Sequence, residues 1–316
     1  MIITVTLNPA LDRTLTIPRF STGTVNRAHE SRLDPGGKGV NVCKVLKTLG
    51  EDPLATGFLG GSAGRAIADA LDSLGIQHDF VAVTGETRTN LKIYDPELLT
   101  YTDINDLGDP VSEESVRALE EKLLLLAKPG DTVLFAGSAP RGIAPELPAA
   151  WARKLSARGV KVAADQDGAQ LLAMIPAKPF LIKPNEHELK EMLNLPNVKE
   201  ETLCRAAREL VRGGIAHVVV SLGEKGALFA DAEGVLFAQG PKVDAVSTVG
   251  AGDSLTAALL FSAERELSRE DAARLAIATA AAKVTCPGSS PPSMALVQHY
   301  FNQVTISTIS FASSPN

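Results

Sequence analysis

A glycine-rich segment with the sequence TVGAGDS, residues 248–254, contains groups that could bind an anion and accept a proton. An alanine-rich segment with the composition of a helix follows it directly. If the helix begins here, the N–H groups of Ala251, Gly252 and Asp253 have no partner within it and, with the positive end of the helix dipole, form an anion site. Gly250 and Gly252 would let a bulky anion approach the backbone. At this end of the helix dipole we expect the charged form of Asp253 to be favoured, so that Asp253 is ionised near neutral pH and can accept a proton from a hydroxyl group.

The alternative for this segment is a glycine turn with Asp253 as an ordinary helix-start residue, since short motifs produce many false matches. A second polar segment, KPNEHE, places Asn185 and Glu188 three residues apart at the start of another expected helix. An amide oxygen and a carboxylate suit Mg²⁺, directly or through its water shell. The same pair could instead form a capping box. The residues alone leave both pairs of interpretations open.

Polar groups in the N-terminal part of the chain could bind a polyol and attract an anion. Asp12 follows the first expected strand, and the segment PGGKGVN puts Gly37, Lys38 and Asn41 at a junction between a loop and a helix. Asp12 could equally be a turn residue and Lys38 a solvated cation. Taken singly, the arginines at positions 27 and 88 are typical of surface charges.

Short apolar strands alternate with helical segments along most of the chain, which predicts a mostly parallel α/β sheet with helices on both faces. The expected strands are IITVTL, PLATGFLG, DTVLFAG, VKVAAD, PFLIKPN and HVVVSLG. One helix is expected to run from KPNEHE to Gly213, and two alanine-rich helices complete the core. Ligands of such sheets bind at the carboxyl ends of the strands. One loop at such an end, SLGEKG, offers Ser221, Gly223 and Gly226 to a nucleotide phosphate or ribose, or forms a hairpin turn.

Two β-rich segments, about 13–32 and 86–105, do not fit this alternation. We interpret them as a small β lid added to one domain of residues 1–303. The remaining residues, 304–316, are rich in serine and threonine, and we expect a peripheral or mobile tail.

The composition argues against several classes of protein. The net charge of −6 argues against nucleic acid as the main partner, because phosphate backbones attract basic surfaces. The cysteines at positions 43, 204 and 286 are far apart, which argues against a disulfide framework or a zinc site. No signal peptide or bilayer-spanning run is recognised. We expect a cytoplasmic protein that binds neither nucleic acid nor membranes.

Seven segments occur in an order and spacing that make the sequence, from residue 1 to about residue 290, resemble the ribokinase-like (PfkB-type) carbohydrate kinases. They are LNPALD, PGGKGVN, TRTN, GSAPRG, KPNEHEL, VVVSLGEKGA and STVGAGDS. The resemblance implies a Rossmann-like sheet with a β lid that pairs in a homodimer. It also implies ATP-dependent phosphorylation of a sugar phosphate. The segments are most similar to the branch acting on fructose 1-phosphate, with tagatose 6-phosphate and fructose 6-phosphate as alternative acceptors.

The resemblance also implies a role for each candidate residue. Asp253 would be the catalytic base, Gly250, Ala251 and Gly252 the anion hole, and Asn185 and Glu188 the residues that organise Mg²⁺. The sugar would contact Asp12, Gly37, Lys38 and Asn41, and its phosphate would face Arg88, Lys38 and Arg27. The nucleotide would lie along Lys183, Asn185, Ser221, Gly223, Gly226 and Thr248.

Two positions depart from the family pattern: Gln166 stands where a small hydroxyl residue is usual, and Ala139 where leucine is common. A non-catalytic sugar- or nucleotide-binding regulator on the same fold would be expected to lack the base, but Asp253 is present. A kinase of unphosphorylated sugars or nucleosides has no need for Arg27, Lys38 and Arg88 around the acceptor.

Overall fold

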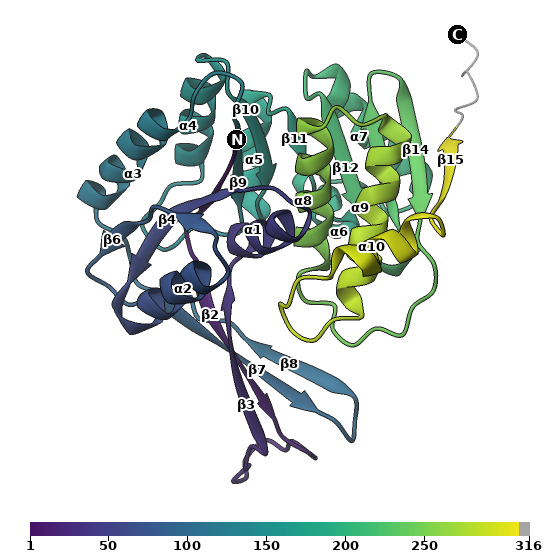
Figure 1. Ribbon diagram of the computed structural model, residues 1–316. Coiled ribbons are helices and arrows are strands. Elements are labelled where there is room, and N and C mark those ends of the chain that lie inside the picture. Colours follow the sequence, from purple (N-terminus) through teal and green to yellow (C-terminus); the bar gives the residue numbers. More distant parts are fainter. Residues whose placement is uncertain (310–316) are drawn as a thin grey trace.

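Eleven strands form the central sheet in the computed structural model, which describes residues 1–309 (Figure 1). From β5 to β12 neighbouring strands run parallel, and β13 to β15 add antiparallel pairs. The mostly parallel sheet is as predicted. Across the sheet, the order is β15 (Thr305–Ile309), β14 (Gly234–Gln239), β13 (Ala227–Asp231), β12 (His217–Ser221), β11 (Leu181–Ile182), β10 (Lys161–Asp165), β9 (Thr132–Ala136), β1 (Ile2–Thr6), β4 (Leu54–Gly60) and β5 (Gln77–His78), with β6 (Val81–Val83) beside β4.

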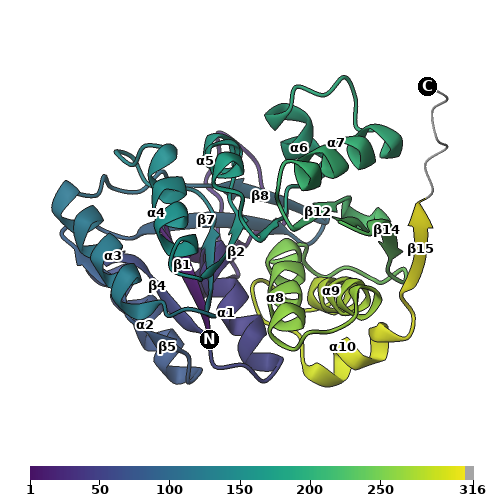
Figure 2. The same cartoon turned by 90° about the horizontal axis from the view of Figure 1, so that it is seen from above.

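Successive side chains of the central strands point to opposite faces of the sheet, and both faces are apolar. In β9, Val133 and Phe135 belong to one buried cluster, and Leu134 and Ala136 to the other. Helices cover both faces, as predicted (Figure 2). The first is covered by α3 (Glu113–Leu126), α4 (Glu146–Ser156), α5 (Gly168–Met174), α6 (Glu186–Met192) and α7 (Glu200–Arg212). The second is covered by α1 (Lys38–Thr48), α2 (Gly61–Ser73), α8 (Ala251–Glu264), α9 (Arg269–Val284) and α10 (Met294–Phe301).

A second, four-stranded sheet projects from the main body (Figure 1). Its order is β3 (Glu30–Gly36), β2 (Ala10–Thr16), β7 (Arg88–Asp95) and β8 (Thr100–Ile104). It joins the two β-rich segments expected to form a lid, but β2 begins at Ala10. Asp12 therefore lies within a strand and not in a turn. That this sheet closes as a lid stays a prediction.

The single helix expected to end at Gly213 is wrong, because two helices, α6 and α7, occupy that stretch. Asn194 has a left-handed backbone with φ of 50°, and Pro196 follows two residues later. A left-handed residue ends a helix, and proline cannot continue one.

The C-terminal part of the described chain holds two elements that were not predicted, α10 and β15. β15 pairs antiparallel with β14 at the edge of the central sheet, within the segment expected to be a tail. The β-branched run TISTI accounts for this strand. Residues 310–316 of the expected tail lie outside the described residues. Among the described helices, none is long and apolar enough to cross a membrane.

Candidate active site

A cleft of about 290 Å³ lies where the small sheet meets the carboxyl ends of the central strands. It is lined by the starts of α1 and α8, by β2 and β7, and by the loop after β9. The predicted site residues on its wall are Asp12, Gly37, Lys38, Asn41, Arg88, Gly250 and Asp253. Residues separated by more than 200 positions thus face one cavity.

The glycine-rich segment does begin a helix, as predicted. Gly250 is the N-cap of α8 with φ of 80°, a left-handed conformation that glycine adopts at little cost. The N–H groups of Gly252 and Asp253 lie in the first turn of α8, so no preceding helical carbonyl accepts their hydrogen bonds. The N–H of Ala251 differs from expectation because it points to the carbonyl of Thr248, 3.3 Å away. Two first-turn N–H groups therefore remain for an anion.

Asp253 is buried, and burial raises its pKa to about 6, with the charge of Asp165 adding to the effect. The expectation that the helix dipole would favour the charged form is therefore wrong in direction. Desolvation and a neighbouring carboxylate outweigh the dipole. Asn41 partly opposes the shift, since its Nδ2 donates to Oδ2 of Asp253 at 2.8 Å. A pKa of about 6 still leaves Asp253 ionised at pH 7.

Asp165 is a buried residue of the site that the sequence reasoning missed. Its carboxylate lies 3.2 Å from Nζ of Lys38 and 3.4 Å from Nζ of Lys183, and it accepts a hydrogen bond from Thr256 Oγ1 at 2.7 Å. Burial opposes ionisation, but these partners hold the pKa of Asp165 below its usual range. The signal was present in the sequence, because the strand VKVAAD ends in an aspartate at the carboxyl edge of the sheet.

Lysines on both sides of Asp165 bring positive charge to the start of α8. Nζ of Lys183 lies 3.4 Å from the position that a Cβ would take on Gly252. Lys38 also pairs with Asp167, 2.5 Å away. Burial would lower the pKa of Lys38, but the charges of Asp165 and Asp167 raise it above its ordinary value.

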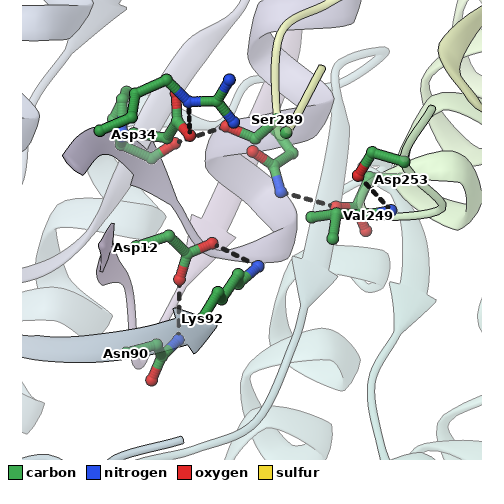
Figure 3. Close-up of polar contacts among 12 residues, drawn as sticks. Asp12, Asp34, Asn90, Lys92, Val249, Asp253 and Ser289 are labelled. Carbon is green, nitrogen blue, oxygen red and sulfur yellow. Dashed lines mark hydrogen bonds and ion pairs between the residues drawn. The ribbon is translucent and has the colours of Figure 1, made fainter. Parts of the chain in front are cut away.

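The small sheet contributes a second cluster, shown in Figure 3. Asp12 Oδ1 accepts from Asn90 Nδ2 at 2.9 Å, and its Oδ2 lies 2.9 Å from Nζ of Lys92. Arg88 belongs to the same strand, where its guanidinium donates to the carbonyls of Asn8 and Asp106. Asn90 and Lys92 were not predicted, although they lie two and four positions after Arg88, which places all three on one strand face.

Arg27 is not brought to the cleft. It is exposed in the connection between β2 and β3, away from the residues that line the cavity. Its assignment to the substrate phosphate has no support within one chain.

The residues expected along the nucleotide lie beside the cleft rather than on its wall. Asn185 and Ser221 form a parallel β-bridge, which brings the segments KPNEHE and SLGEKG together. Gly226 lies in the turn after β12, where a Cβ would stand 2.1 Å from the carbonyl oxygen of Ala238. Packing against β14 thus explains this glycine. Gly223 has open space around it, and Thr248 is exposed.

Asn185 and Glu188 form the capping box that the sequence left as one of two interpretations. Oδ1 of Asn185 accepts the N–H groups of His187 and Glu188, and Oε2 of Glu188 accepts the N–H of Asn185. Among the described residues, no cluster of three or more acidic, histidine or cysteine side chains could hold a metal ion. The capping box uses one of the two carboxylate oxygens of Glu188. A hydrated Mg²⁺ usually takes one or two carboxylates together with substrate phosphates.

A larger cavity of about 670 Å³ lies at the opposite ends of the strands, around β10 to β14. Its wall is mainly apolar, and three of its charged residues pair with one another, Arg269 with Asp231 at 3.1 Å and with Glu233 at 3.4 Å. Asp253, the candidate base, and Gly250, the N-cap of α8, both line the smaller cleft, so we expect the chemistry there.

Comparison with known proteins finds relatives in sequence and in structure over nearly the whole chain. Residues 5–295 match the model of the pfkB family of carbohydrate kinases. A 1-phosphofructokinase of Haemophilus influenzae is 37% identical over 309 residues, covering 98% of both chains. A 1-phosphofructokinase of Vibrio cholerae is 38% identical over 287 residues, covering 91% of this chain and 90% of its own. A crystal structure of phosphofructokinase-2 from Escherichia coli in complex with substrates and products has a TM-score of 0.92 and 29% identity, over 95% of this chain and 98% of that chain.

Proposed function

Because the chain belongs to the pfkB family of carbohydrate kinases, we propose that it transfers the γ-phosphoryl group of ATP to fructose 1-phosphate, giving fructose 1,6-bisphosphate. The relatives named 1-phosphofructokinase support this acceptor. The observation that carries the proposal is the cleft itself. It places a buried carboxylate at the start of a helix on one side and a cluster of cations on the other.

Asp253 is the proposed catalytic base. Its pKa of about 6 leaves it ionised near neutral pH but basic enough to take a proton from a hydroxyl group. The hydroxyl oxygen then attacks the γ-phosphorus, the bond to the β-phosphate oxygen breaks, and the proton stays on Asp253. Asn41 orients the carboxylate through its hydrogen bond.

The start of α8 is proposed to receive the transferring group. The N–H groups of Gly252 and Asp253, together with the ammonium of Lys183, supply positive potential where negative charge is redistributed. These groups are fixed before the substrates arrive, so no reorganisation is needed during transfer.

The small sheet is proposed to orient the sugar phosphate. Asp12 offers a carboxylate to sugar hydroxyls, and Lys92 and Arg88 supply positive charge for the existing phosphate. Binding energy from that remote phosphate positions the reacting hydroxyl against Asp253.

Mg²⁺ is part of the proposal, and it would neutralise charge on the nucleotide phosphates. Glu188, next to the bridge between Asn185 and Ser221, is the residue proposed to hold it through water. Asn185 contributes by capping α6, since its side-chain oxygen is already bonded to two N–H groups.

A homodimer formed through the small sheet is also proposed. Large apolar side chains remain exposed on this sheet within one chain, among them Leu33, Tyr101 and Ile104. A tetrameric inhibited form of the Escherichia coli phosphofructokinase-2 shows that this related kinase assembles. Location in the cytoplasm belongs to the same proposal, and the free thiols of the chain agree with it.

The experiment that tests the function measures ADP release with fructose, fructose 1-phosphate, fructose 6-phosphate and tagatose 6-phosphate. We expect the highest kcat/KM with fructose 1-phosphate and poor turnover of free fructose. A higher kcat/KM with either 6-phosphate would change the acceptor but keep the kinase class. Efficient turnover of free fructose would contradict the phosphate-binding role of Arg88 and Lys92.

A further inference from the structure

A buried lysine that the proposed reaction does not use lies directly behind the anion-binding loop. Lys283 is in the last turn of α9 and is 2% exposed. Its Cε lies 3.4 Å from the position that a Cβ would take on Gly250, and Oδ2 of Asp253 lies 3.9 Å from the same point. Lys283 and the proposed base therefore flank the glycine at which α8 begins.

The charge of Lys283 has no acidic partner in its immediate surroundings. Its Nζ donates to the carbonyl of Gly288 at 2.7 Å, and within residues 1–309 no carboxylate lies at ion-pairing distance. Burial lowers its pKa, and the neighbouring groups of Cys286, Asp253 and Asp34 offset only part of that effect. An unpaired buried charge is costly, so its retention beside an anion site indicates a use for the charge.

The last turn of α9 also carries the loop that leads to Gly250. The carbonyl of Val284 accepts the N–H of Val246 at 2.7 Å and the N–H of Ser247 at 3.0 Å. Oγ of Ser247 then accepts the N–H of Val249 at 3.3 Å. A shift of this turn would therefore move the anion-binding loop.

A second buried lysine, Lys44 of α1, has a structural role that contrasts with Lys283. Its Nζ donates to the carbonyl of Pro35 and to Oγ of Ser289, each at 2.8 Å. It thus ties the end of β3 to the segment after α9. Lys283 differs because, within residues 1–309, a single acceptor is bonded to its Nζ, and its side chain packs against Gly250.

We propose that Lys283 is a positioning residue for phosphoryl transfer, whose ammonium supplies fixed positive charge behind Gly250, at the helix end whose Val284 carbonyl holds the segment 246–250 that receives the γ-phosphoryl group. The inference rests on the proposed function, since the anion at this loop is the transferring group. Charges oriented before the reaction stabilise a transition state without reorganisation. The sugar phosphate meets other elements, so its binding should not depend on Lys283.

Turnover of three variants tests this inference. Lys283→Met keeps the length of the side chain but removes the charge, Lys283→Arg keeps the charge, and Arg274→Met removes a cation from the same helix, where it bonds to the carbonyl of Val304. We expect Lys283→Met to lower kcat roughly 10- to 100-fold, with the Kd for fructose 1-phosphate and the melting temperature nearly unchanged. Lys283→Arg should retain more activity, and Arg274→Met should retain wild-type kcat.

Nucleotide binding gives a readout that does not depend on the sugar. The γ-phosphate is the group that reaches the loop, so Lys283→Met should weaken a non-hydrolysable ATP analogue roughly tenfold more than ADP. If the wild-type protein phosphorylates none of the sugars but this selective loss is found, the proposed function fails and the role of Lys283 stands. Wild-type kcat with equal losses for both nucleotides would overturn the inference, as would activity losses that only follow a lowered melting temperature.

Discussion

The two sides of the cleft are built in opposite ways. On the side of the small sheet, Asp12 is paired with Lys92 and Asn90, and the guanidinium of Arg88 is bonded to two carbonyls. On the side of α8, the first-turn N–H groups have no helical partner, and burial raises the pKa of Asp253.

This difference suggests that the small sheet orients the substrate, whereas the start of α8 acts on the reaction itself. Paired groups hold their geometry without a ligand and can orient a sugar phosphate with little loss of entropy. Unpaired groups cost stability in the free protein but act most strongly on charge that develops during the reaction. Changes on the α8 side should therefore lower kcat, whereas changes on the small sheet should act through the use of the sugar phosphate.

The largest effect is expected from Asp253→Asn. The amide cannot accept the proton, so kcat should fall roughly 10²- to 10⁴-fold, the range for loss of a general base. The Kd values for nucleotide and sugar phosphate, measured by titration, should change little. Asp271→Asn is a matched control because Asp271 is also a first-turn aspartate, at the start of α9. Near-normal turnover of Asp253→Asn would make Asp253 a helix-start residue and remove the contrast between the two sides.

Arg88→Ala should produce the next largest effect, on the small-sheet side. Loss of the guanidinium should lower kcat/KM for fructose 1-phosphate roughly 10²-fold and leave the Kd for ATP nearly unchanged. Arg141→Ala is the control, since Arg141 is an exposed arginine that bonds weakly to the carbonyl of Gly108. If ATP binding weakened as much as the use of fructose 1-phosphate, Arg88 would support the loop near Asn8 rather than bind the substrate.

The sequence was sufficient to predict most of the fold and those residues of the cleft wall that lie in glycine-rich or charged motifs. The alternation of apolar strands with helices fixed the parallel sheet, and Asp253 followed from its position after two glycines. The pKa of Asp253 could not be predicted, because burial and the charge of Asp165 come from packing between α8 and β10. Lys283 lies in an alanine-rich helix, and only the fold places it behind Gly250.

A smaller effect is expected from pH. Asp253 must be deprotonated to accept a proton, and its pKa is about 6, so kcat/KM should fall about tenfold per unit as the pH drops below 6. Sugar phosphates also titrate near pH 6. Asn41→Ala distinguishes titration of Asp253 from titration of the sugar phosphate, because the hydrogen bond from Asn41 lowers the pKa of Asp253. The midpoint of the pH profile should move to higher pH in this variant, and an unmoved midpoint would assign the titration to the substrate.

The smallest effect is expected at the capping box, which lies outside both sides of the cleft. Glu188→Gln removes the charge, but its amide oxygen can still accept the N–H of Asn185. If Glu188 holds hydrated Mg²⁺, this variant should need roughly tenfold more Mg²⁺ for half-maximal activity, with an unchanged melting temperature. Glu188→Ala is the comparison, since it also removes the cap and should cost about 1 kcal/mol of stability. A Glu188→Gln enzyme with a wild-type Mg²⁺ titration, beside a destabilised Glu188→Ala enzyme, would assign this pair to capping alone. Mg²⁺ would then have to be held by the nucleotide and by residues facing the cleft, so the start of α8 would have to neutralise more of the phosphate charge.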